Sequence, residues 1–193
     1  VFMLAAALNF ITHLSAFKSR SLAPYARDPE AYAVLGLILA SCLGIALYLW
    51  GMGVYSEFWT ALRHASFNLV SLATDCGFAS VDFGQWPLFA PMWMLFLSAV
   101  TASSGSTGGG LKMIRAMLLF KPGARELERQ LHPAANLPVK IGEHAVAGGV
   151  IFAIQAFAMM YMVTLISATP VLPAPGPDLL SPFSPVVACI NNA

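Results

Sequence analysis

Residues 103–110 read Ser103-Ser104-Gly105-Ser106-Thr107-Gly108-Gly109-Gly110. They interrupt a run from residue 83 to residue 111 that contains no Lys, Arg, Asp or Glu. Three successive glycines are weak helix formers and expose backbone polar groups. One or two small residues would fit close helix packing in a membrane. Eight in a row favour an unwound segment in or beside a pore, because irregular backbone at membrane depth must line a watery cavity or lie buried in protein.

The composition of the chain is typical of an integral membrane protein. Of its 193 residues, 58% are hydrophobic and only 10% are charged, whereas a soluble domain carries about a quarter charged residues. The high hydrophobicity also excludes a disordered chain, and no basic surface indicates a nucleic-acid partner. The cysteines, Cys42, Cys76 and Cys189, form no CxxC pair, so the sequence predicts neither a disulfide framework nor a zinc site.

Uncharged stretches predict where the chain crosses the membrane, since a spanning helix needs about 20 apolar residues. We expect spanning helices over 31–56 and 145–168, and the exit half of an earlier helix over 1–17. Shorter helical segments over 57–73 and 179–190 are expected to enter the membrane halfway and return. Because apolar runs reach both ends of the chain, we expect an internal piece of a longer polytopic protein, truncated at both ends.

The basic residues predict the orientation. All Lys and Arg residues except Arg63 lie between residues 18 and 27 or between residues 112 and 140. Cytoplasmic loops of membrane proteins carry an excess of Lys and Arg. We therefore expect residues 18–30 and 112–144 in the cytoplasm, and residues 54–90 and 169–193 facing outward.

The order of these segments indicates an internal repeat. A spanning helix, a half-helix, a re-entrant loop and a second helix are followed by a link, after which the pattern starts again. The expected fold class is an all-α membrane protein built from helix–pore helix–helix units, as in K⁺ channels. The expected divisions are the end of a preceding unit (1–30), one complete unit (31–123), a cytoplasmic linker with a short helix over 124–131 (124–144), and a further unit truncated at its filter (145–193).

The residues Thr74-Asp75-Cys76-Gly77-Phe78 follow the half-helix directly and form a candidate ion-binding turn. A glycine permits positive φ and lets carbonyl oxygens point inward, where they can replace the hydration shell of a monovalent cation. The half-helix would aim the negative end of its dipole at that cation. An ordinary turn between two helices is the alternative. Asp75 either attracts cations or turns its side chain away to accept backbone N–H bonds, whereas Asp82 is expected to be a solvated loop charge.

Nothing in the sequence predicts catalysis. The 103–110 stretch is followed by Leu111-Lys112, so it lacks the GKS or GKT ending of a phosphate-binding loop, and it does not match the GxSxG pattern of serine hydrolases. The four histidines are scattered without metal-ligand spacing, and no nucleophile, base and acid converge on one side of the membrane. We expect neither an enzyme nor a bound cofactor.

The sequence resembles the membrane subunit of the Trk/Ktr/HKT superfamily of potassium transporters, and it is most similar to the bacterial Trk-type subunit. The similar stretches are Ala73 to Phe83 with Trp86-Pro87, Gly105 to Arg115, Asn191-Asn192, and Asn9-Phe10 with Arg27 to Glu30. The resemblance implies four units around one pore, each with a filter strand centred on a glycine. Gly77 is the one such glycine that can be assigned here, because the fourth filter stops before its glycine. Asp75 and Cys76 stand where small hydroxyl or apolar residues are more usual.

The resemblance also implies the functional parts. K⁺ would be the transported ion, held at Thr74, Asp75, Cys76 and Gly77, in a filter that further includes Phe78, Asn191 and Asn192. Residues 103–110 would gate the pore, through which dehydrated K⁺ passes passively or in a coupled (symport) mechanism. The expected partners are a second copy, a cytoplasmic ring of nucleotide-binding regulatory subunits, and the lipid of the bacterial inner membrane. The alternative is a non-conducting scaffold or permease domain of a multi-subunit transporter.

Overall fold

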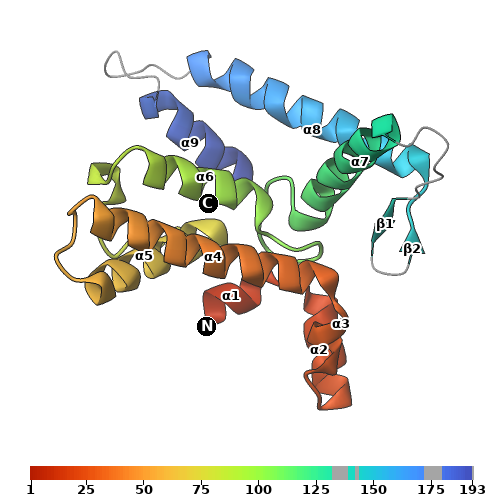
Figure 1. Ribbon diagram of the computed structural model, residues 1–193, viewed down its shortest axis with the longest axis horizontal. Helices are drawn as coiled ribbons and strands as arrows, with labels where there is room; N and C mark the ends of the chain where they lie inside the picture. The colour runs from red at the N-terminus through yellow and green to blue at the C-terminus, as the bar shows by residue number, and fades with distance from the viewer. Residues whose placement is uncertain (132–138, 142–143, 172–179, 193) are drawn as a thin grey trace.

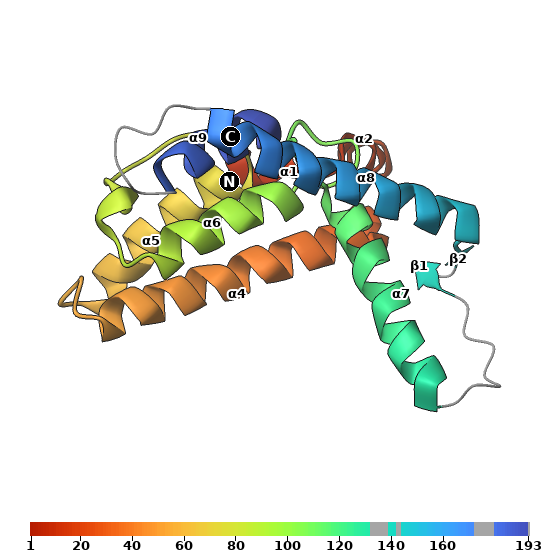
Figure 2. The same cartoon turned by 90° about the horizontal axis from the view of Figure 1, so that it is seen from above.

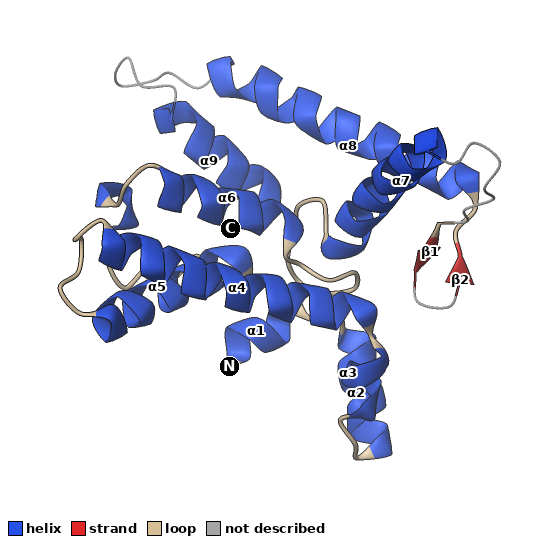
Figure 3. Cartoon of the chain, in the orientation of Figure 1, coloured by secondary structure: helices blue, strands red, loops and turns tan. Residues whose placement is uncertain are grey.

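The computed structural model describes residues 1–131, 139–141, 144–171 and 180–192 (Figure 1). Their regular structure is helical apart from an antiparallel hairpin of β1 (Lys140–Ile141) and β2 (His144–Ala145) (Figure 3). The α-helices are α1 (Phe2–Ala7), α2 (Phe10–Ser19), α3 (Ala23–Arg27), α4 (Pro29–Gly51), α5 (Phe58–Ala73), α6 (Phe89–Val100), α7 (Met113–Leu131), α8 (Gly148–Ala168) and α9 (Leu180–Asn191), with 3₁₀ turns η1 (Phe83–Gln85) and η2 (Thr169–Val171). The helical fold class is confirmed.

Within the part of the chain that the structure describes, two helical stretches, Pro29–Gly51 and Gly148–Val171, are long and apolar enough to cross a membrane. They carry exposed apolar side chains along their length, such as Leu39 on α4 and Phe152 on α8. These helices match the segments expected over 31–56 and 145–168, although α4 ends earlier, at Gly51. Its start is fixed by Asp28, whose side chain accepts hydrogen bonds from the first turn of the helix.

The apolar run over 83–111 does not form one spanning helix. Within it, α6 has 12 residues and ends at Val100, which is too short to cross a bilayer by itself. The chain then runs without helical structure until α7 begins at Met113. The prediction that residues 103–110 are unwound is thus confirmed.

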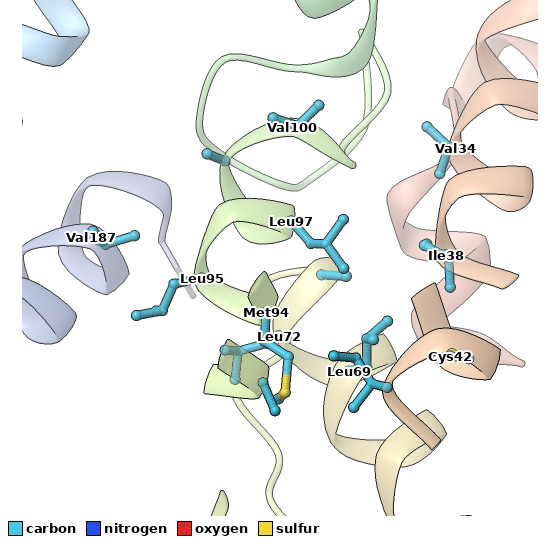
Figure 4. Packing of buried hydrophobic residues seen from close by; sticks show 14 of the residues in the cluster. Val34, Ile38, Cys42, Leu69, Leu72, Met94, Leu95, Leu97, Val100 and Val187 are labelled. Atoms are coloured by element: carbon cyan, nitrogen blue, oxygen red, sulfur yellow. The ribbon is translucent and has the colours of Figure 1, made fainter. Parts of the chain in front are cut away.

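Helices α4, α5 and α6 form the core, with α9 packed on α6 (Figure 1). Figure 4 shows how their buried side chains meet. The side chains come from α4 (Val34, Ile38 and Cys42), α5 (Leu69 and Leu72), α6 (Met94, Leu95, Leu97 and Val100) and α9 (Val187). Close packing of this kind is the main attraction between helices in lipid, and it holds α5 between its two neighbours.

Helix α8 packs against both α7 and α9, whereas α7 projects away from the core helices (Figure 2). The guanidinium carbon of Arg115 on α7 lies 4.5 Å from the ring centre of Phe157 on α8. A cation over an aromatic face is attractive, so this contact helps to orient α7 as it leaves the 103–110 stretch.

Two expected elements differ from the structure. The helix expected over 1–17 is broken at Leu8 and Asn9, so this prediction was wrong. Asn9 starts a new helix, because its side chain accepts a hydrogen bond from Ile11 N at 2.8 Å. The helix expected over 124–131 is instead the second half of α7, which runs through Pro122. Glu126 and Arg129, three residues apart on this helix, form an ion pair at 3.9 Å.

Candidate functional site

The chain leaves α5 in a tight turn, residues 74–78, which we call the α5 turn. Two of its residues have left-handed backbone, Asp75 at φ 56° and Gly77 at φ 71°. Glycine adopts this conformation without a steric cost, and Asp is among the few other residues that tolerate it. Gly77 therefore lets the backbone reverse its direction immediately after α5.

Polar side chains of α5 hold the N–H groups of this segment. Ser71 Oγ accepts a hydrogen bond from Phe78 N at 2.6 Å, and the Ser71 carbonyl accepts one from Cys76 N at 2.9 Å. Asn68 Oδ1 accepts one from Ser80 N at 2.9 Å. Ser71 and Asn68 are completely buried. The N–H groups of Cys76, Phe78 and Ser80 are thus directed toward α5.

The carbonyl oxygens of the same turn remain available. Among the described residues, no hydrogen bond is donated to the carbonyl groups of Asp75, Cys76, Gly77 or Phe78. Free carbonyl oxygens can take the place of water around a monovalent cation. The C-terminal end of α5, where the helix dipole is negative, lies directly before them. The arrangement therefore suits a cation held by backbone oxygens.

The side chains of Thr74 and Asp75 make hydrogen bonds with Val70 and Gly109, respectively. Thr74 is buried, and its hydroxyl donates to the carbonyl of Val70 at 2.7 Å. Asp75 Oδ2 accepts a hydrogen bond from Gly109 N at 2.8 Å, and Asp75 Oδ1 is buried without a partner among the described residues. Of the two roles that the sequence allowed for Asp75, the structure shows acceptance of a backbone N–H bond.

Residues 103–110, here called the glycine loop, have close neighbours on several sides. A Cβ atom on Gly109 would lie 2.1 Å from the carbonyl oxygen of Asn191, and one on Gly110 would lie 2.7 Å from the carbonyl oxygen of Ala99. Gly110 also has φ +69°. Side chains at these two positions would collide with backbone atoms, which explains why glycines occupy them. The loop is wedged between α6 and the end of α9.

Backbone hydrogen bonds fix the loop at both ends. Ser103 N donates to the carbonyl of Ala7 at 2.9 Å, and Leu111 N donates to the carbonyl of Ala99 at 2.8 Å. Within the loop region, Lys112 Nζ lies 3.4 Å from the carbonyl of Ser106. The loop is therefore an ordered segment that backbone hydrogen bonds hold at both ends, as irregular backbone buried inside a membrane protein requires.

Asn191 connects three helices behind the glycine loop. Its side chain is fully buried, accepts a hydrogen bond from the Tyr161 hydroxyl at 2.6 Å, and donates to Ser98 Oγ at 2.8 Å. The structure thus places Asn191 at the end of α9, with its backbone against Gly109. Asn192 follows with left-handed backbone, at φ 65°. The site brings together Asp75, Gly109 and Asn191 from three separate segments.

Sequence reasoning did not identify several residues that support this site. They are Asn68, Ser71, Ser98, Thr101 and Tyr161; the Thr101 hydroxyl, for instance, donates to the carbonyl of Ala73 at the end of α5. Each is a polar side chain within or next to an apolar helix. Buried polar groups in membrane helices are usually paired and functional, so this pattern was the signal that could have identified them.

Comparison with known proteins agrees with this geometry. A family model described as cation transport protein TrkH matches residues 52–193. The chain is 38% identical over 192 residues to the Trk system potassium uptake protein TrkH of Salmonella typhimurium, covering 100% of the chain and 40% of that protein. It is 31% identical over 191 residues to TrkG of Escherichia coli, covering 99% of the chain and 39% of that protein.

A solved structure shows the same fold. The crystal structure of the potassium transporter TrkH from Vibrio parahaemolyticus matches with a TM-score of 0.90 and 38% identity, covering 99% of this chain and 41% of that one. The chain spans about 40% of the length of the relatives it matches. These relatives are transport proteins, in agreement with the expectation that the chain is not an enzyme. The resemblance stated from the sequence is confirmed, and the chain belongs to the TrkH family of cation transport proteins.

Proposed function

We propose that this chain forms part of a potassium-conducting pore in the bacterial cytoplasmic membrane. In this proposal the α5 turn is one strand of the selectivity filter, and the glycine loop is the gate. The observation that carries it is the α5 turn itself. Its N–H groups other than that of Gly77 are bonded to α5, and the carbonyl oxygens of residues 75–78 receive no hydrogen bond from the described residues.

Potassium is the ion that this arrangement favours. A strand of carbonyl oxygens can replace the hydration shell of K⁺, and Gly77 carries no side chain that would narrow the site. The carbonyl groups of Thr74, Asp75, Cys76 and Gly77 would supply one quarter of the ligands, and other units of the full-length protein would supply the rest. The names of the related Trk potassium uptake proteins support the same ion.

The glycine loop lies against the α5 turn and has the contacts expected of a gate. Asp75 holds it through Gly109 N, and Asn191 contacts it from α9. Displacing the loop would break the hydrogen bond to Asp75 and open the path beneath the filter. Three glycines in succession give the backbone the freedom to adopt a second arrangement.

The remaining features of the full-length protein are proposed from the family. Residues 31–123 would form its third unit, and residues 1–30 would be the end of the second. A cytoplasmic linker (124–144) would lead to the start of the fourth unit (145–193). Asn192 would enter the fourth filter. Residues 18–30 and 112–144 would face the cytoplasm, and residues 54–90 and 169–193 the outside. A second copy and a cytoplasmic ring of nucleotide-binding subunits would complete the transporter.

Rubidium uptake tests this proposal. The full-length protein that contains this chain is expressed, with its regulatory partner, in cells that lack their own K⁺ uptake systems. Uptake that K⁺ competes for, and that cells with the empty vector lack, supports the pore. No uptake from cells that demonstrably hold the protein in their membrane would instead favour a non-conducting scaffold, and the filter and gate assignments would be abandoned.

A further inference from the structure

Glu30 contacts both sides of the glycine loop with one carboxylate oxygen. It lies in the first turn of α4 and is 5% exposed. Its Oε1 atom accepts a hydrogen bond from Ser104 N at 2.7 Å and another from Ile114 N at 3.1 Å. Ser104 is near the start of the loop, and Ile114 follows its end. The Oε1 atom of Glu30 therefore joins the chain near the start of the loop to the chain just after its end.

The chemistry of these bonds makes them strong. Ile114 is in the first turn of α7, where backbone N–H groups have no partner within the helix and the helix dipole favours a negative charge. A carboxylate from α4 satisfies this N–H group and, with the same oxygen, that of Ser104. Without this oxygen, both N–H groups would lose their hydrogen-bond partner.

Glu30 is itself held in place by the residues around the start of α4. Asp28 Oδ1 accepts a hydrogen bond from Glu30 N at 3.0 Å, and Asp28 Oδ2 accepts one from Thr12 Oγ1 of α2 at 2.9 Å. A continuous series of hydrogen bonds thus runs from α2, through Asp28 and Glu30, to the glycine loop. The residues of this series that lead to the loop all precede α5 in the chain. The contact with Asp75, by contrast, comes from the turn that follows α5.

We propose that Glu30 is a positioning residue that fixes the two ends of the glycine loop and so holds the gate in place. The role in gating rests on the proposed function, whereas the role in holding the loop does not. Glu30 contacts the loop and has no hydrogen bond with the α5 turn. Its removal should therefore change how often the path is open without changing which ion is preferred.

The test combines a measurement of loop position with a measurement of transport. Ser103 is completely buried, and its hydroxyl has no partner among the described residues, so Ser103→Cys provides a reporter that breaks no hydrogen bond described here. The rate at which a maleimide labels this cysteine is measured in an otherwise cysteine-free full-length protein. Three variants are compared: Glu30→Ala, Glu30→Gln, whose amide oxygen can still accept both bonds, and Glu57→Ala, an exposed control.

We expect Glu30→Ala to raise the labelling rate about tenfold or more, as the loss of two buried hydrogen bonds implies. The cysteine in Glu30→Gln and in Glu57→Ala should be labelled within about threefold of the parent's rate. That ratio corresponds to a smaller free energy than one typical neutral hydrogen bond contributes. In proteins without the reporter, Glu30→Ala should raise Rb⁺ uptake while leaving the preference for K⁺ over Na⁺ unchanged.

Three results would overturn the proposal: labelling of Glu30→Ala at the parent's rate, labelling of Glu30→Gln as fast as that of Glu30→Ala, or equally faster labelling in all three variants. If the parent takes up no Rb⁺ but the labelling pattern is as expected, Glu30 still holds the loop. In that case the proposed transport function alone is contradicted.

Discussion

Asp75 Oδ2 and the backbone N–H of Gly109 lie 2.8 Å apart, so that the α5 turn and the glycine loop share a hydrogen bond. The donor and the acceptor come from segments on either side of α6 in the chain, and each lies in non-helical backbone. A displacement of either segment must break or stretch this bond. It is the direct physical link between the proposed filter and the proposed gate.

Substitutions at Asp75 should therefore change gating. Asp75→Gly keeps the left-handed backbone free of strain but removes the acceptor, so Rb⁺ uptake by the full-length protein should rise by about tenfold, because a buried hydrogen bond no longer holds the loop. Asp75→Asn retains an oxygen that can accept from Gly109 N and should remain within about threefold of the parent. Uptake rates normalised to the amount of protein in the membrane check both.

Asp82 provides the matched control. Its side chain accepts hydrogen bonds from Gly84 N and Gln85 Nε2 nearby in the chain and has no hydrogen bond with the glycine loop. Asp82→Asn should leave uptake unchanged. Equal uptake by Asp75→Gly and the parent would show that the bond does not restrain the loop.

Gly109 should not tolerate a side chain. A Cβ atom there would lie 2.1 Å from the carbonyl oxygen of Asn191, and backbone cannot move away cheaply. We expect Gly109→Ala to lower the free energy of unfolding by about 1–3 kcal/mol, as overpacking generally does. Gly36→Ala on α4, where no atom outside the local helix backbone lies within 4 Å of the added carbon, should be neutral or stabilise by up to about 1 kcal/mol.

Chemical unfolding of the detergent-solubilised protein measures both changes. Similar stability of Gly109→Ala and the parent would mean that the glycine loop can move away from α9 without cost, contrary to the wedged arrangement described here.

The local features of the fold could be predicted because each depends on neighbouring residues. The uncharged runs of α4 and α8 exceed the thickness of a bilayer, and the successive glycines of residues 108–110 exclude a regular helix. The break at Asn9 depends on more than its local capping bond to Ile11 N. Phe10 N donates to the carbonyl of Gly105 at 3.3 Å, a partner that is distant in sequence and is not apparent from composition.

The candidate site shows the same limit. The position of the α5 turn follows from a half-helix that ends before Thr74-Asp75-Cys76-Gly77, so the sequence indicates it. The partners of its side chains do not follow, because Asp75 meets Gly109 and Glu30 meets Ser104 only after the helices have packed. Polar residues on apolar helices indicate that partners exist, but the identity of each partner depends on the tertiary fold.

The buried network around Asn191 should contribute to stability. Tyr161→Phe removes the hydroxyl that donates to Asn191 Oδ1 at 2.6 Å and leaves a buried acceptor unsatisfied, which costs about 1–3 kcal/mol. Tyr32→Phe alters a side chain that is 60% exposed and should have almost no effect. The stabilities of the two variants are compared through their unfolding midpoints in detergent. Equal midpoints would show that water replaces the lost hydroxyl.

The identity of residue 77 tests the central claim, that the α5 turn selects K⁺. Competition between Na⁺ and Rb⁺ uptake is measured for the full-length protein with Gly77→Ser and, as a control, with Gly53→Ser. Gly53 has similar backbone, at φ 74°, but lies in the turn after α4 with no atom near an added side chain. Both variants therefore bear the same backbone cost of about 1–2 kcal/mol. We predict that Gly77→Ser loses the preference for K⁺ while Gly53→Ser keeps it; an unchanged preference in Gly77→Ser would contradict the assignment of the filter.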